Sequence, residues 1–88
     1  IFVTVGSTDF DALVARMDAL APQLGAEVVM QIGLGEYVPQ HGRFFRFAPS
    51  LDHHYDQAEV VVAHGGLGTI VEVLERGKRL ICVVNPAT

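Results

Sequence analysis

A run of four apolar residues followed at once by a glycine-rich turn limits the folds open to this chain more than any other feature. The run is Val60–Ala63, and the turn is His64-Gly65-Gly66-Leu67-Gly68. A short, continuously apolar segment bounded by a turn is typical of a strand that is buried on both faces. The sequence therefore predicts a parallel sheet with helices on both sides.

Strand-like and helical segments alternate along the rest of the chain. Four more segments are rich in β-branched and aromatic residues, as strands are: Ile1–Val5, Glu27–Ile32, Phe44–Phe47 and Arg79–Val84. Three segments are expected to be helical: Phe10–Ala21, a brief helix through Tyr55–Ala58 that Ser50 or Asp52 can cap, and Thr69–Glu75. This alternation, without repeats or linkers, predicts an α/β fold, a Rossmann-like doubly wound parallel sheet of about five strands in one domain over residues 1–88.

Charge and composition exclude several classes of protein. Six Lys and Arg against ten Asp and Glu give a formal charge of −4, and no basic cluster offers a footprint for nucleic acid. The longest strictly apolar runs, such as Leu80–Val84, have about five residues, whereas a membrane span needs roughly 20. The single Cys82 cannot form an internal disulfide, which favours a reducing compartment, and its place in a predicted buried strand indicates a structural thiol.

Half of the 88 residues are hydrophobic, a large share for so short a chain. The sequence stops at Thr88, directly after the last predicted strand, so no helix follows to cover that strand. We therefore expect a domain that is truncated at its C-terminus and lacks its last helices. One flank of the sheet should be bare, as the face meant for a missing C-terminal helix and a partner.

The glycine-rich turn is also the most informative candidate site. A strand that delivers such a turn onto a helix N-terminus directs unpaired N–H groups and the positive end of the helix dipole at one spot, which suits a phosphate. The hydroxyl of Thr69 can bind the same anion, and Glu72, one turn further, can accept hydrogen bonds from a ribose. Three glycines would let phosphates approach the backbone closely: Gly65, Gly66 and Gly68.

The turn can also be compared with a purely structural connection and with the two common nucleotide-binding motifs. A glycine-rich turn after a strand is often only a tight connection, and this alternative stays open. The GxxxxGK[ST] loop fails because the lysine is absent, and GxGxxG fails because Gly6-Ser7-Thr8, after the first strand, has one glycine. Dehydrogenase and NTPase functions are therefore disfavoured.

The residues around the turn resemble a known family. The segment His64-Gly-Gly-Leu-Gly-Thr-Ile-Val-Glu72 is similar to the sugar-nucleotide motif of glycosyltransferase family 28 C-terminal domains, and it shares the HxGxx[ST]xxE skeleton of plant-type UDP-glycosyltransferases. Further segments resemble, in order and spacing, the small catalytic subunit of two-component UDP-N-acetylglucosamine transferases of the dolichol-linked and exopolysaccharide types: Ile1–Thr8, Gln31–Gly33, Tyr55, Gly77–Ile81 and Val83–Asn85.

The resemblance implies the donor-binding, C-terminal half of a GT-B hexosyltransferase. Such an enzyme would transfer a sugar, expected to be N-acetylglucosamine, from a UDP-sugar to a lipid-linked or polysaccharide acceptor. Gly66, Gly68 and Thr69 would hold the diphosphate, His64 would lie near it or near the sugar, and Glu72 would take the ribose hydroxyls. The implied donor-binding set spans both turns: Gly6, Thr8, His64, Gly65, Gly66, Gly68, Thr69 and Glu72.

The same resemblance bears on cofactors and partners. No metal or other cofactor is expected, because helix-end amides would replace the divalent ion that otherwise neutralises the leaving diphosphate. The acceptor and the unnamed catalytic base would lie across the cleft, on an acceptor-binding partner subunit or domain that can be membrane-associated. The expected location is the cytoplasm, peripheral to a membrane through that partner. The alternative is a non-catalytic interaction module that binds a partner through its hydrophobic flank.

The remaining candidate residues are expected to be structural. His53 and His54 would point about 100° apart on a helix, so solvated side chains are expected rather than zinc ligands. Asp9 and Asp11 are expected to be capping charges at the start of the first helix. The aromatic residues near the third strand are expected to pack in the core and at the sheet edge: Phe44, Phe45 and Phe47.

Overall fold

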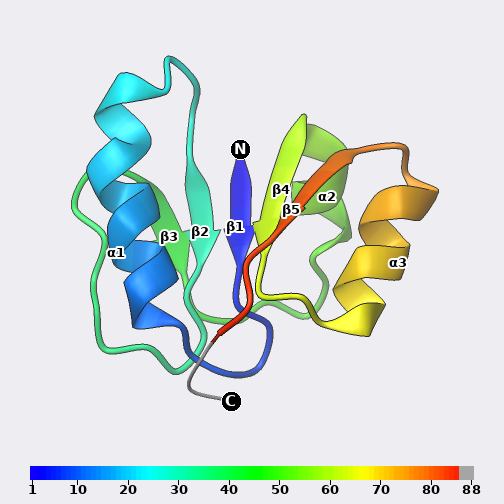
Figure 1. Cartoon of the computed structure of the whole chain (residues 1–88), viewed down its shortest axis with the longest axis horizontal. Coiled ribbons are helices and arrows are strands. Elements are labelled where there is room, and N and C mark those ends of the chain that lie inside the picture. The colour runs from blue at the N-terminus through cyan, green and yellow to red at the C-terminus, as the bar shows by residue number, and fades with distance from the viewer. Residues whose placement is uncertain (86–88) are drawn as a thin grey trace.

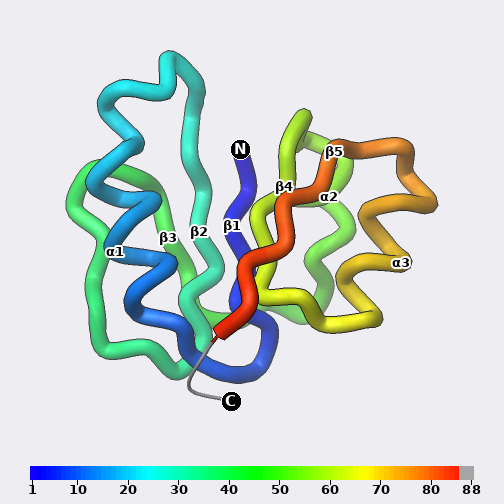
Figure 2. Tube along the Cα trace, viewed as in Figure 1, coloured from blue at the N-terminus to red at the C-terminus, as the bar shows by residue number. Residues whose placement is uncertain are grey.

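The computed structural model describes residues 1–85 and contains one sheet of five parallel strands (Figures 1 and 2). The strands are β1 (Phe2–Thr4), β2 (Val29–Gln31), β3 (Arg43–Phe45), β4 (Val60–Ala63) and β5 (Arg79–Cys82). Their order across the sheet is β3-β2-β1-β4-β5. The predicted α/β, Rossmann-like fold is confirmed, whereas the predicted end of the domain at Thr88 lies outside the described residues.

The helices lie where the sequence places them, with small changes at their ends. They are α1 (Asp11–Leu20), followed by the 3-10 turn η1 (Ala21–Gln23), α2 (Asp52–Gln57) and α3 (Leu67–Glu75). Neither Ser50 nor Asp52 is the N-cap residue of α2: Leu51 takes that position, and no side chain among the described residues caps the helix there. The Ser50 hydroxyl, one residue earlier, accepts a hydrogen bond from the Asp52 N–H at 3.1 Å. The strands are shorter than predicted. For example, β3 ends at Phe45, and the next side chain, Arg46, donates to the Gly33 and Gly35 carbonyl oxygens.

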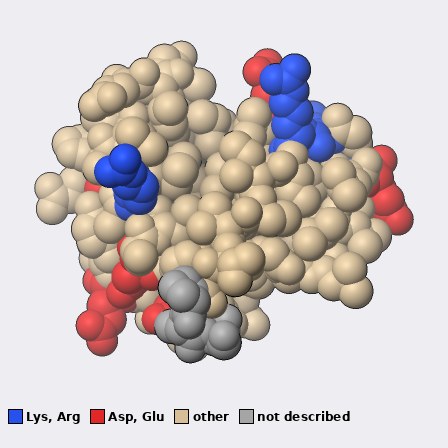
Figure 3. All heavy atoms as spheres, in the orientation of Figure 1, with Lys and Arg blue, Asp and Glu red and all other residues tan. Residues whose placement is uncertain are grey.

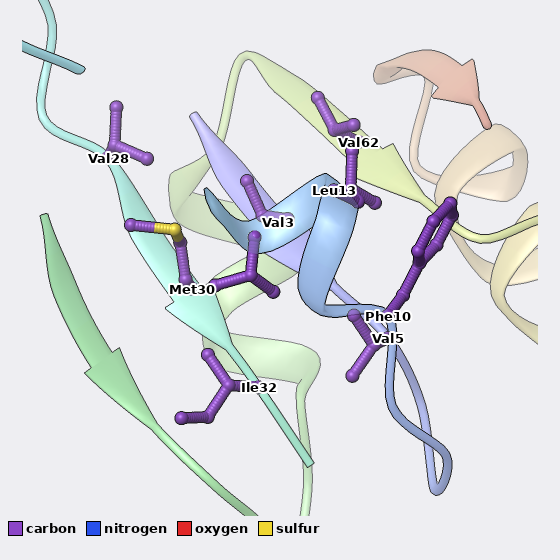
Figure 4. Close-up of a cluster of buried hydrophobic side chains, with 9 residues drawn as sticks. Val3, Val5, Phe10, Leu13, Val28, Met30, Ile32 and Val62 are labelled. Atoms are coloured by element: carbon purple, nitrogen blue, oxygen red, sulfur yellow. The ribbon is translucent and has the colours of Figure 1, made fainter. Parts of the chain in front are cut away.

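The helices cover the two faces of the sheet from opposite sides of β1. Because crossovers between parallel strands are right-handed, strands added on opposite sides of β1 carry their helices on opposite faces. On one face, Leu13 and Val14 of α1 pack with Val3, Met30 and Val62 (Figure 4). On the other face, α2 and α3 contribute to a second cluster with the sheet: Phe2, Tyr55, Ala58, Val61 and Val73.

The face that carries α1 is open over β4 and β5. An apolar groove of about 510 Å³ runs between α1 and these strands, with Leu13, Met17, Val62 and Ile81 among its walls. In the space-filling view, the middle of the molecule is almost free of charged side chains (Figure 3). The predicted bare flank is therefore present. Along residues 1–85 no helix is long and apolar enough to cross a membrane.

Two predictions about single residues are wrong because they overlooked where the strands lie in the sheet. Cys82 is exposed and not buried, because β5 is an edge strand that pairs only with β4. His54 is not solvated: its ring stacks on Phe2 at 5.0 Å and on Phe45 at 4.6 Å, and burial lowers its pKa. Of the three phenylalanines, Phe45 packs as expected, while Phe44 and Phe47 are exposed.

Candidate functional site

The two turns that the sequence singles out lie side by side at one edge of the sheet. β1 and β4 are adjacent, parallel and in register, with Thr4 beside Ala63 at their carboxyl ends. The strand order reverses between them, since β2 and β3 lie on one side of β1 and β5 lies beyond β4 (Figure 1). In open α/β sheets, ligands bind outside the carboxyl ends of the strands at this reversal.

His64 fills the space between the two turns. A Cβ atom added at Gly6 would lie 2.7 Å from His64 Nε2, and one added at Gly66 would lie 2.8 Å from His64 Cε1. Both distances are too short for a real side chain, so glycine at these positions lets the imidazole sit between the turns. The structure thus brings together Gly6, His64 and Gly66, which the sequence analysis had linked only through the resemblance.

The start of α3 is open to solvent. Gly66 is the residue before the helix, and no side chain in the described part of the chain caps it. Cβ atoms added at Gly65 or Gly68 would meet nothing within 4 Å. The backbone around the start of α3 is therefore open and its first N–H groups lack a capping side chain, an arrangement that favours an anion.

Thr69 and Glu72 lie on α3 beyond this opening. Thr69 is half-buried and forms a side-chain hydrogen bond with Tyr55, and this bond works against the rise in the Tyr55 pKa that burial causes. Glu72 is exposed, and its main-chain oxygen accepts from Arg76 Nη1 at 3.1 Å. Arg76 also binds Asp52 at 2.7 Å and Asp56 at 3.0 Å, which ties α3 to α2.

The turn after β1 is held by Thr8, a member of the predicted donor-binding set, and by Gln31, for which the sequence predicted no site role. The Thr8 hydroxyl donates to the Val5 carbonyl oxygen at 3.0 Å, and the Thr8 carbonyl oxygen accepts from the Leu34 N–H at 3.1 Å. Gln31, at the end of β2, binds both the N–H and the carbonyl oxygen of Gly6, at 3.0 and 2.8 Å. Two sequence signals point to Gln31: it is a polar residue at the end of an apolar strand, and it lies in the segment Gln31–Gly33 that shares the family resemblance.

Two carboxylates of α1 hold the loop that follows β2. Asp11 lies in the first turn of α1, where its charge was predicted, but among residues 1–85 no side chain forms a capping hydrogen bond there. The Asp11 carboxylate instead accepts from the N–H groups of Glu36 and Tyr37 at 3.2 and 3.3 Å. Asp9 is exposed, and its main-chain oxygen accepts from Asn85 Nδ2 at 3.1 Å. Asp18, a buried carboxylate on α1, was not predicted from the sequence.

Asp18 accepts hydrogen bonds from four groups of the loop. They are the Tyr37 hydroxyl at 2.7 Å and the N–H groups of Gln40, His41 and Gly42 at 2.8 to 3.2 Å. Burial acts to raise the pKa of Asp18, but these hydrogen bonds outweigh it and lower the pKa to about 2. Asp18 is therefore charged at neutral pH and anchors the loop.

Metal-ligating side chains do not gather in the part of the chain that the structure describes. No group of three or more His, Cys, Asp or Glu residues is close enough to hold a metal ion among residues 1–85. His53 and His54 are neighbours in α2, and their rings lie at 73° to each other. The His54 ring stacks on Phe2 and Phe45. The anion-binding geometry at α3 is thus the strongest candidate site.

Comparison with known proteins agrees with the fold. The model of the glycosyltransferase family 28 C-terminal domain matches residues 1–88. The mouse (Mus musculus) UDP-N-acetylglucosamine transferase subunit ALG13 is 41% identical over 97 residues, which is 96% of this chain and 8% of that protein. The human (Homo sapiens) protein of the same name is 36% identical over 98 residues, 97% of this chain and 9% of its own length. The chain thus spans less than a tenth of these relatives.

A solved structure shares the fold. The glycosyltransferase of kitacinnamycin superposes with a TM-score of 0.71 and 25% identity, over 98% of this chain and 25% of that one. The family match covers the described strands and helices and both glycine turns. On this evidence, the chain belongs to the family of glycosyltransferase family 28 C-terminal domains.

Proposed function

We propose that this chain is the donor-binding part of an inverting hexosyltransferase that takes a sugar, N-acetylglucosamine, from a UDP-sugar and transfers it to a lipid-linked or polysaccharide acceptor. The observation that carries the proposal is the meeting of the two glycine turns around His64, beside the open start of α3. The family match and the names of the ALG13 relatives, which are UDP-N-acetylglucosamine transferase subunits, support the choice of donor.

In this proposal the diphosphate lies at the start of α3. Gly66, Gly68 and Thr69 hold it, with His64 beside the diphosphate or the sugar and Glu72 on the ribose hydroxyls. The turn after β1 lines the cleft, with Gly6 and Thr8 facing the donor. Gly65 has φ of +96° and open space around it, which suits a turn that must let a phosphate approach.

In this proposal these residues act by stabilising the negative charge on the leaving diphosphate. An acceptor hydroxyl attacks the anomeric carbon, the bond from that carbon to the diphosphate oxygen breaks, and UDP leaves with the electron pair. N–H groups at a helix start stabilise the negative charge that grows on the diphosphate, so no divalent ion is needed in this proposal. The base that takes the acceptor proton belongs to the acceptor-binding side.

A partner subunit or domain completes the proposed enzyme. It supplies the acceptor site, and it can place the enzyme at a membrane from the cytoplasm. The apolar groove beside α1 leaves large hydrophobic side chains in contact with water, among them Ile81, which is 53% exposed. Exposed apolar surface of this kind is typical of faces that another segment or subunit covers.

Binding of UDP to the full-length protein tests the proposal. We expect Glu72→Gln to raise the Kd for UDP by about 10-fold or more, because a charge-assisted hydrogen bond to the ribose is lost. Glu75→Gln, about one turn further from the start of α3, is the control and should leave the Kd unchanged. Calorimetric titration with UDP and with 2′-deoxy-UDP should show that Glu72→Gln also loses the preference for the ribose. No heat of binding at millimolar UDP, with the fold intact, would exclude the function.

Gly68→Ala separates a binding turn from a merely structural one. The added methyl group meets nothing within 4 Å of the protein, and alanine in the first turn of α3 should stabilise the fold by about 0.5–1 kcal/mol. If a diphosphate lies against this glycine, the same methyl group must weaken UDP binding, by about 10-fold or more. A variant that unfolds at higher urea and still binds UDP like the wild type would favour the non-catalytic alternative.

A further inference from the structure

Gln31 is buried at the carboxyl end of β2, where its amide contacts the ends of the two neighbouring strands, β1 and β3. Its side chain is among the largest that are fully buried, although it is polar. Burying a primary amide is unfavourable unless both its oxygen and its nitrogen find partners. Oε1 accepts from the Thr4 hydroxyl at 2.6 Å and from the N–H groups of Val5 and Gly6, and Nε2 donates to the carbonyl oxygens of Gly6 and Arg46.

Two of these hydrogen bonds hold Gly6 from both sides. The Gly6 N–H lies 3.0 Å from Oε1, and the Gly6 carbonyl oxygen lies 2.8 Å from Nε2. Gly6 has φ of +67°, a conformation that glycine reaches easily but is equally free to leave. Bonds on both sides of its Cα restrict φ and ψ together, so the Gln31 amide determines which way the following turn points.

Gly6 also lies close to the His64 ring. Its Cα faces the His64 ring so closely that a Cβ would lie 2.7 Å from Nε2. A rotation at Gly6 would therefore shift Ser7 and Thr8 and disturb the packing of His64 at the same time. The Gln31 amide thus acts on both turns while remaining buried below them.

From these contacts we infer that Gln31 is a positioning residue for the donor nucleotide. It holds Gly6 in its left-handed conformation, and in that way sets the turn after β1 and the His64 ring at the geometry that receives the diphosphate. This inference rests on the proposed function. The Gln31 side chain touches no donor atom itself, and it acts through Gly6.

Thr4 offers a matched control within the same polar cluster. Its hydroxyl donates to Oε1 at 2.6 Å and accepts from the Gly6 N–H at 3.3 Å, but it has no contact with the Gly6 carbonyl oxygen. Thr4→Val removes these two hydrogen bonds and keeps the shape, while Gln31 still binds both the N–H and the carbonyl oxygen of Gly6. Gln31→Met also keeps the shape, and it removes the hydrogen bonds to both the N–H and the carbonyl oxygen of Gly6.

Calorimetric titration of the full-length wild type and of both variants with UDP tests the inference. Both variants should unfold at lower temperature than the wild type. Below all unfolding transitions, Gln31→Met should raise the Kd for UDP by about 10-fold or more, and Thr4→Val by less than about 3-fold. Equal increases in both variants, or wild-type affinity in Gln31→Met, would overturn the inference. Absence of UDP binding by the wild type would instead overturn the proposed function.

Gln31→Glu gives a second readout, which a purely structural role would not produce. The introduced carboxylate can accept from the Val5 and Gly6 N–H groups, but it faces the carbonyl oxygens of Gly6 and Arg46 without a proton to donate. Burial and these oxygens raise its pKa, so protonation restores one donor as the pH is lowered. The affinity of the variant for UDP, divided by that of the wild type at each pH, should rise as the pH is lowered. A constant or falling ratio contradicts the inference.

Discussion

Replacing Gly33 by alanine is expected to destabilise the protein by about 3–5 kcal/mol, because two penalties coincide at this position. Gly33 has φ of +57°, in the left-handed region that favours glycine. A Cβ atom here would also overlap the Thr8 carbonyl oxygen and lie 3.1 Å from Val5 Cγ2. The Thr8 carbonyl oxygen belongs to the backbone, so it can move away from the new methyl group only if the whole turn after β1 shifts. Urea unfolding of the wild type and the variant measures the loss.

Gly25→Ala is the control for this prediction. Gly25 has a similar φ of +65°, but a Cβ atom added there would meet nothing within 4 Å. Its substitution should cost only the backbone strain, about 1–2 kcal/mol. If the two variants lose the same stability, the contact between Gly33 and Thr8 does not constrain the turn.

The second large effect is expected at Asp18. Asp18→Ala removes the acceptor for the Tyr37 hydroxyl and for the N–H groups of three loop residues, Gln40 to Gly42. Leaving buried donors without an acceptor should cost about 2–4 kcal/mol and loosen the loop. Hydrogen exchange should show faster exchange of the amide hydrogens at residues 40–42, and urea unfolding should show the loss of stability.

The contribution of Asp18 depends on pH in a direction that follows from its pKa. The pKa is lowered from 3.8 to about 2 in the folded protein, so the unfolded chain binds the proton more tightly than the native state does. The stabilisation is fully present above pH 4 and is lost as the pH falls from about 4 to about 2. Asp18→Asn keeps the shape without the charge, and the stability difference from the wild type should shrink over this window. A difference that stays constant down to pH 2 would contradict the assignment.

The order of strands and helices could be predicted because each segment carries its own signal. Val60–Ala63 is apolar throughout and becomes β4, with Val61, Val62 and Ala63 buried. The apolar positions of Phe10–Ala21 recur at helical spacing, and Pro22 follows them at the start of η1. These are local properties of the chain, and local spacing is enough to determine them.

Single residues were misjudged where their surroundings come from distant segments. His54 was predicted to be solvated, but it is half-buried because its ring stacks on Phe2 and Phe45 from two different strands. Cys82 looked buried because its neighbours in sequence are apolar, yet the strand order places it at the sheet edge. Burial depends on which segments become neighbours, and hydropathy along the chain does not contain that information.

The sequence by itself determined the fold class and the glycine-rich turn that begins α3, because strand alternation and glycine spacing are written along the chain. Only the tertiary structure decided that β1 and β4 lie side by side, that His64 fills the space between Gly6 and Gly66, and that Gln31 holds Gly6 in place. The physical reason is that these contacts join residues more than 20 positions apart. Such contacts exist only once the sheet has brought the strand ends together.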